Sequence, residues 1–389
     1  MAEQNISFSP VMLKATGPSF ENLPTKENPP APQGGGVPVW TPQDYTTVSQ
    51  VGSKVAVGNI SSVSIIDNKT FVWVNGLLYS YDINQNSVDF FKVFSGGGSF
   101  SGNMHYLRSK AYGNELALSN GNDGSERVRF VNFSEDLNVA TVYSYSAAIA
   151  QYKAFNIGVD VSDKYYARGS NPANSSSGSV YIQDKNLNSV RTINCPPYGQ
   201  VTYANGVTGT INPRGFGSTC ALYGDTIFIG AYTSGSIPGS SITSQMGLVF
   251  AYDIITGNQL GIIYSLTNIS DAKFGKDIFI SGDNLVISTG KTGRTFVYDA
   301  NTMTWKKSII PNTTAYDNAQ MSAYGNYCVI SFPYHTGGGI AYVYNINTGA
   351  LLASMTPDTT TENFGWSNYI FEDKITVASA NGIYVYRLS

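Results

Sequence analysis

Short runs of alternating apolar and polar residues recur along most of this chain, bounded by glycine, asparagine or aspartate. Alternation with a period of two is typical of β-strands, whereas a helix repeats its apolar positions about every 3.6 residues. The most regular run is rich in β-branched and aromatic residues. Its seven copies read TFVWVN at 70–75, NELALS at 114–119, KYYARG at 164–169, TIFIGA at 226–231, NLVIST at 284–289, YCVISF at 327–332 and KITVAS at 374–379.

A tight turn is predicted before each copy, because Gly, Asn, Asp and Ser either tolerate left-handed backbone or bond their own backbone. The seven turns are Asp67-Asn68, Gly113-Asn114, Ser162-Asp163, Gly224-Asp225, Gly282-Asp283, Gly325-Asn326 and Glu372-Asp373. The first and the last lie 305 residues apart over six intervals, so the repeat is about 51 residues long. A period of this length indicates an array of similar units.

Three further strands complete the unit. A second run, usually opened by glycine, reads GLLYSYD at 76–82, ERVRFVN at 126–132, GSVYIQD at 178–184, GLVFAYD at 247–253, GRTFVYD at 293–299, GIAYVYN at 339–345 and GIYVYRL at 382–388. The aspartates that end several copies (Asp82, Asp184, Asp253, Asp299) are interpreted as turn formers. A third run follows in six units, and another strand opens the unit, clearest after Phe-Gly at 216, 274 and 364.

Four antiparallel strands repeated seven times predict an all-β fold, a seven-bladed β-propeller of four-stranded antiparallel blades. A solenoid and propellers of six or eight blades are the alternatives. The seventh unit reaches Ser389 after three strands, and an unmatched strand-like segment lies at 46–57. Pairing this N-terminal strand beside 382–388 leaves no open sheet edge, which favours closure. We therefore predict a propeller over residues 46–389.

Residues 1–45 differ in composition from the rest. Eight of the 16 prolines fall before residue 43. Because proline removes a backbone donor and fixes φ, neither a regular helix nor a central strand is expected here. A disordered tail and an extended arm that orders on a partner both fit this composition. Scattered apolar residues favour an anchoring arm, with partner contacts expected at Phe8, Val11, Leu13, Phe20, Leu23 and Trp40.

The repeats resemble the FG-GAP class of propeller repeats. FGSTCALYGDTIFIGAY at 216–232 has the order of that pattern, and FGKDIFISGDNLVIS at 274–288 keeps its first two parts. The resemblance covers about half of the units well and implies a propeller. Integrin-type members carry D-x-D-x-D-G calcium loops, and the nearest approach here, Asn120 to Gly124, has one carboxylate. Calcium needs several charged oxygen ligands, so a hairpin turn is expected there instead.

Composition bounds the chemistry. Only 13% of residues are charged, the net charge is −3, and no Lys/Arg run occurs, so nucleic-acid binding is not expected. Cys195, Cys220 and Cys328 lack metal or disulfide spacing and are interpreted as buried free thiols.

Neither a membrane span nor a signal pattern is found, which indicates synthesis in the host cytoplasm. His105 and His335 have no zinc spacing, and no nucleotide or nucleophile motif is present, so we expect neither enzyme activity nor a cofactor or metal. A glycosidase is the alternative that stays open, because its two catalytic carboxylates come together only in the folded protein and leave no sequence motif.

Three insertions exceed the repeat, at 168–178, 195–215 and 231–247. They are rich in Ser, Gly, Asn and Tyr, which supply adaptable hydrogen bonds and rigid aromatic area in recognition loops. We expect ligand contacts at Tyr198, Tyr203, Arg214 and Tyr232. Surface decoration without a binding role is the alternative.

An arm, a rigid closed head and a charge-poor surface together suggest a structural subunit of a virus particle. The architecture resembles propeller modules of tailed-bacteriophage virion proteins, in the tail, the collar or fibre region, or the capsid exterior. This resemblance implies several copies in an assembly, held to other virion subunits by the arm, and a possible host glycan or receptor as partner. A lectin-like propeller that binds carbohydrate or a receptor, and an intracellular protein–protein scaffold, are the alternatives.

Overall fold

The computed structural model places β-strands throughout the repeat region. It describes residues 44–56, 60–74, 77–83, 91–94, 108–120, 126–135, 137, 140–147, 158–170, 178–197, 199–202, 208–211, 213–233, 246–264, 273–311 and 318–389. These residues form strands, turns and bends and contain no helix. Within the same ranges, therefore, no helix is available to cross a bilayer. Nearly all of the predicted arm, and the Asn120–Gly124 turn after its first residue, lie outside them.

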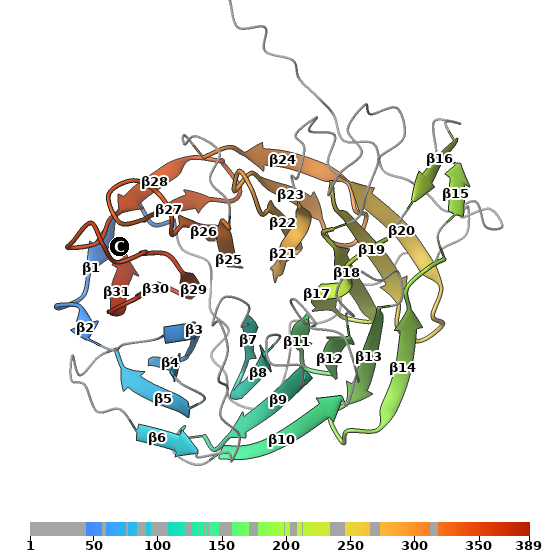
Figure 1. The fold of residues 1–389 in the computed structure, drawn as a ribbon, viewed down its shortest axis with the longest axis horizontal. Helices are drawn as coiled ribbons and strands as arrows, with labels where there is room; N and C mark the ends of the chain where they lie inside the picture. Colours follow the sequence, from blue (N-terminus) through green and yellow to red (C-terminus); the bar gives the residue numbers. More distant parts are fainter. Residues whose placement is uncertain are drawn as a thin grey trace, which may run out of the picture.

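Seven sheets are arranged in a ring, with the first strand of each blade innermost and the last strand at the rim (Figure 1). All strand pairs within the blades are antiparallel. The first three blades are β3 (Ile60–Ile66), β4 (Lys69–Val74), β5 (Leu77–Asp82) and β6 (Phe91–Phe94); β7 (Arg108–Tyr112), β8 (Glu115–Asn120), β9 (Glu126–Phe133) and β10 (Ala140–Ala147); and β11 (Val159–Val161), β12 (Tyr165–Ser170), β13 (Ser179–Asp184) and β14 (Ser189–Asn194).

The next three blades repeat this order without a crossover. They are β17 (Phe216–Tyr223), β18 (Thr226–Ala231), β19 (Leu248–Asp253) and β20 (Gln259–Tyr264); β21 (Phe274–Ser281), β22 (Asn284–Thr289), β23 (Thr295–Asp299) and β24 (Trp305–Ile309); and β25 (Gln320–Tyr324), β26 (Tyr327–Phe332), β27 (Ile340–Asn345) and β28 (Leu351–Met355). The predicted all-β, seven-bladed propeller is confirmed.

The seventh blade is completed from the other end of the chain, as predicted. Its own strands are β29 (Ser367–Phe371), β30 (Lys374–Ser379) and β31 (Gly382–Leu388). Two short N-terminal strands, β1 (Val48–Gln50) and β2 (Val55–Ala56), both pair with β31. The outer edge of β31 is therefore covered at both ends, which removes an open edge.

The first hairpin of each blade has a two-residue turn. In six of the seven turns the first residue has positive φ, at Asp67, Gly113, Gly224, Gly282, Gly325 and Glu372. The third blade differs, because its turn is Asp163-Lys164 and not the predicted Ser162-Asp163. There the Ser162 hydroxyl accepts hydrogen bonds from the backbone N–H groups of Lys164 (3.3 Å) and Tyr165 (3.1 Å). A serine side chain thus orders the one turn that lacks a left-handed residue.

The predicted turn role of the strand-ending aspartates is confirmed for three of them. The carboxylates of Asp184, Asp253 and Asp299 each accept hydrogen bonds from backbone N–H groups two to four residues later. Asn345 does the same in the sixth blade. These side chains order the turns between the third and fourth strands.

The Phe-Gly pairs make the junctions between blades. Phe216, Phe274 and Phe364 are fully buried, and the glycine after each has positive φ. The backbone of each phenylalanine presses on the glycine that opens the third strand of the preceding blade. A Cβ on Gly247, for example, would lie 2.1 Å from the carbonyl oxygen of Phe274. The two glycine positions that mark the repeat in the sequence are therefore explained by one close backbone contact.

Polar side chains also join neighbouring inner strands. The Thr219 hydroxyl donates to the carbonyl oxygen of Gly275 in the next blade (2.7 Å). The Asp277 carboxylate accepts from the backbone N–H of Met321 (3.1 Å), again one blade further on. Thr219 and Asp277 both stand five residues before their turn, so this position recurs as a link around the ring.

Strand alternation gives the propeller two different faces. The turns between first and second strands, and between third and fourth strands, lie on one face, which we call the turn face. The connections between second and third strands, and from one blade to the next, lie on the other, the loop face. The insertions at 168–178, 195–215 and 231–247 all leave and rejoin the blades on the loop face.

Candidate functional site

The loop face holds every predicted ligand contact that the structure describes. Arg214 is exposed, whereas the Tyr232 side chain is largely buried, at 8% exposure. The two lie on adjoining segments, because a Cβ on Gly215 would meet the Thr233 hydroxyl at 2.6 Å. Tyr198 and Tyr203 lie outside the described residues, as do the arm residues Phe8, Val11, Leu13, Phe20, Leu23 and Trp40.

The insertion at 195–215, expected to be a loop, contains a hairpin. β15 (Gly199–Thr202) pairs with β16 (Thr208–Ile211) as a separate two-stranded sheet outside the blades (Figure 1). The two ends of the insertion come together, since the Cys195 thiol lies 3.5 Å from the carbonyl oxygen of Pro213. The insertion is thus a projection with a narrow base on the loop face.

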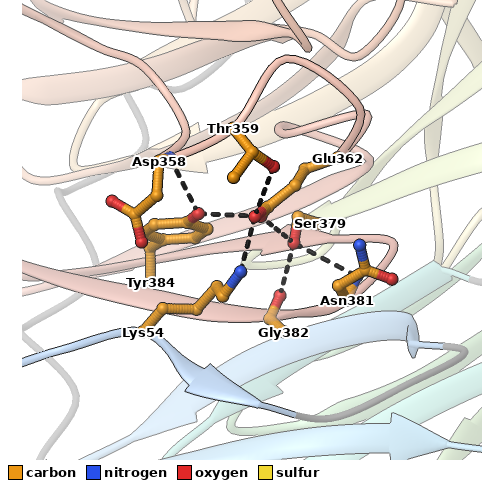
Figure 2. A network of polar contacts seen from close by, with 8 residues as sticks. All are labelled: Lys54, Asp358, Thr359, Glu362, Ser379, Asn381, Gly382 and Tyr384. Atoms are coloured by element: carbon orange, nitrogen blue, oxygen red, sulfur yellow. Dashed lines mark hydrogen bonds and ion pairs between the residues drawn. The ribbon is translucent and has the colours of Figure 1, made fainter.

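A buried polar cluster lies where the N-terminal segment meets the seventh blade (Figure 2). Its centre is Glu362, which is fully buried. Glu362 Oε1 accepts hydrogen bonds from Lys54 Nζ (2.5 Å) and Thr359 Oγ1 (3.0 Å). Glu362 Oε2 accepts from the Tyr384 hydroxyl (2.7 Å) and Ser379 Oγ (3.0 Å). We call these five residues the closure network.

The four donors keep Glu362 ionised. Burial alone would raise the pKa of its carboxyl, but the ion pair and hydrogen bonds outweigh burial and hold the pKa below its usual value. Burial also raises the pKa of the Tyr384 phenol, so it remains a donor. Because Glu362 has no exposed surface, no substrate reaches it, and the closure network acts structurally.

Side chains from three blades meet across the centre of the ring. Lys110 Nζ donates to the carbonyl oxygen of Ile278 (2.6 Å) and lies 3.1 Å from the centroid of the Phe279 ring. The backbone N–H of Ala111 donates to the Tyr369 hydroxyl (2.9 Å). These contacts join blades two, five and seven, so the inner strands are bridged across the axis.

Among the described residues, no group of three or more His, Cys, Asp or Glu side chains is placed to hold a metal ion. All three cysteines are free. Cys220 and Cys328 are buried, as predicted, while Cys195 is only partly buried. Burial raises the pKa of the Cys195 thiol to about 11, which leaves it protonated and unreactive at neutral pH.

An aromatic pair on the loop face was missed by the sequence analysis. Tyr334 lies between β26 and β27, and Trp366 immediately precedes β29. Their ring centroids are 5.9 Å apart and their planes are nearly perpendicular, at 87°. The two residues are 32 positions apart, and only the junction between blades six and seven brings them together.

No protein-family model matches this sequence, and no curated protein matches it either.

Proposed function

We propose that this protein is a non-enzymatic structural subunit of a virus particle, of the tailed-bacteriophage kind, in the tail, the collar or fibre region, or the capsid exterior. Residues 1–45 anchor it to neighbouring subunits, several copies are present, and the propeller is displayed.

The observation that carries the proposal is the way the root of the arm is fastened. The backbone N–H of Tyr45 donates to the Tyr327 hydroxyl (2.5 Å), and the N–H groups of Thr46 and Thr47 donate to the carbonyl oxygen of Ser389 (3.0 and 2.9 Å). β1 and β2 then pair with β31, and Lys54 enters the closure network between them. Such successive attachments suit a segment that transmits load from an anchor to the ring.

Sparse charge supports a role in assembly. Charged residues are only 13% of the chain. Few charges lower the desolvation cost when subunits pack.

Cosedimentation with purified particles tests the proposal. The full chain is expected in the particle fraction, and a variant with Phe20, Leu23 and Trp40 changed to Ser is expected to stay in solution. A variant with Ile310→Ser, in the connection after β24 on the loop face and 60% exposed, serves as the folded control. Recovery of the unchanged chain only in the soluble cell fraction would sink the proposal and favour an intracellular scaffold.

Limited proteolysis sharpens the same test. Cleavage within residues 1–45 is expected in the isolated protein and is expected to disappear in the particle. Equal cleavage in both states would identify a passive tail.

A further inference from the structure

The Tyr334–Trp366 pair forms a corner of two perpendicular aromatic rings on the loop face. Tyr334 is 45% exposed, and Trp366 is half-buried. Four large apolar side chains are exposed among the described residues, and Tyr334 is one of them. It lies at the junction of blades six and seven. An exposed aromatic side chain held by a second ring is a common element of a recognition surface.

The backbone under this corner is fixed. The N–H of Gly339 donates to the carbonyl oxygen of His335 (3.0 Å), and the N–H of Phe364 donates to that of Gly338 (2.6 Å). The N–H of Trp366 donates to the carbonyl oxygen of Ala378 (3.2 Å). Little ordering is therefore left for a ligand to impose, which favours binding.

Tyr334 lies in the connection between β26 and β27, and Trp366 ends the connection between β28 and β29. The closure network supports the second of these connections. Glu362 and Thr359 belong both to the network and to the connection between β28 and β29. A Cβ on Gly338 would lie 2.6 Å from the carbonyl oxygen of Thr359, so the loop after Tyr334 packs directly on that connection. The aromatic corner and the connection form one continuous surface.

Exposed small polar side chains lie on the same two connections as Tyr334 and Trp366. Exposed groups on the two loops are Thr336, Asp358, Thr359, Thr360, Thr361 and Asn363. They offer hydroxyl, amide and carboxylate groups, with a single charge among them. A protein interface core would require a wider apolar area than two rings.

We propose that the Tyr334–Trp366 corner, with the threonine-rich 358–363 connection, is a saccharide-binding site. The C–H face of a pyranose ring stacks on an aromatic ring, while its hydroxyls exchange hydrogen bonds with hydroxyl, amide and carboxylate groups. The perpendicular second ring limits how the sugar is oriented. This inference does not depend on anchoring by the arm, and it places the site three blades from the predicted contacts at Arg214 and Tyr232.

An NMR titration tests the site on the full-length protein. The probes are methyl glycosides of glucose, galactose, mannose, rhamnose and N-acetylglucosamine, and the readout is the Trp366 indole N–H resonance, assigned with Trp366→Phe. At least one glycoside is expected to shift this resonance saturably. Tyr334→Ala is expected to weaken binding roughly tenfold, and Tyr334→Phe to leave it nearly unchanged because the ring is kept.

Ile255→Ala, which removes an exposed apolar side chain on the turn face, is the matched control and is expected to bind as the unchanged protein does. The proposal is overturned if no glycoside moves the Trp366 resonance of the folded protein. It is also overturned if Tyr334→Ala binds as tightly as Tyr334→Phe. Neither result bears on cosedimentation, so failure here is distinguishable from failure of the anchoring role.

Discussion

The two faces of the propeller are built on different principles. On the turn face most of the contacts lie at or near the surface: two-residue turns, aspartate-ordered turns, and tyrosines that reach the next turn. The hydroxyls of Tyr165 and Tyr223 donate to Asp225 (3.0 Å) and Asp283 (2.8 Å), one blade further on. On the loop face the contacts are more deeply buried, through the Phe-Gly junctions and the closure network around Glu362. The face that also carries the insertions therefore has the more deeply buried contacts.

This difference predicts that substitutions on the loop face cost more stability than comparable ones on the turn face. The largest effect is expected for Glu362→Ala, which leaves Lys54 and three hydroxyl donors without their common acceptor. Breaking a buried ion pair costs about 3–5 kcal/mol, and chemical denaturation would measure this loss in the free energy of unfolding. Glu362→Gln keeps the shape and one of the two acceptor oxygens, so it should cost less than Glu362→Ala. Equal losses for Ala and Gln would show that the charge of Glu362 accounts for the whole effect, and a negligible loss for Glu362→Ala would contradict the prediction.

Two glycines with positive φ give a matched comparison between the faces. Gly247→Ala would place a Cβ 2.1 Å from the carbonyl oxygen of Phe274, whereas a Cβ on Gly282 meets nothing within 4 Å. Gly282→Ala should cost about 1 kcal/mol from its left-handed backbone alone. Gly247→Ala adds a clash with backbone and should cost about 3 kcal/mol or more in the free energy of unfolding. Similar losses at both positions would argue that the Phe-Gly junction is easily adjusted.

Acid titration separates the closure network from the rest of the protein. The folded-state pKa of Glu362 is below its usual value, so its stabilisation is present above about pH 4.3 and is lost as pH falls through the folded pKa. The stability difference between the unchanged protein and Glu362→Gln should therefore shrink on acidification. A difference that is constant with pH would mean that Glu362 is not ionised in the folded protein.

The smallest effect is expected for the exposed ion pair on the turn face. Lys164 and Asp225 lie 3.2 Å apart with side chains 49% and 33% exposed. Lys164→Ala should change stability by about 0–1 kcal/mol, and less in high salt. Lys54→Ala, in the closure network, should be several times more costly. A reversed order would overturn the proposed difference between the faces.

The fold could be predicted because its signals are local and repeated. Alternation gives the strands, and glycine and aspartate mark turns whose geometry depends on one or two residues. Closure of the ring by residues 46–57 could be predicted because the seventh unit has only three strands and this segment is the one strand without a unit. The predicted turn of the third blade was wrong by one residue. There the Ser162 hydroxyl orders the turn, which has no residue with left-handed backbone.

The candidate sites depend on distant partners, and this is why the sequence analysis missed them. Lys54 and Glu362 are 308 residues apart and Tyr334 and Trp366 are 32 apart, and no periodicity marks either pair. The side chain of Tyr232 lies largely buried beside Thr233, a position that loop composition cannot reveal. Whether Tyr198, Tyr203 and the arm residues make contacts stays a prediction.

Pairing of β1 with the end of β31 gives the molecule a direction. β31 runs from the loop face at Gly382 to the turn face at Leu388, and Val48 pairs with Leu388. Residues 44–47 therefore lie at the turn face. If residues 1–45 are fixed in a particle, the turn face looks inward and the loop face, with its insertions and aromatic corner, looks outward. This attachment would orient the head, so that the surface carrying the insertions is the one that meets the surroundings.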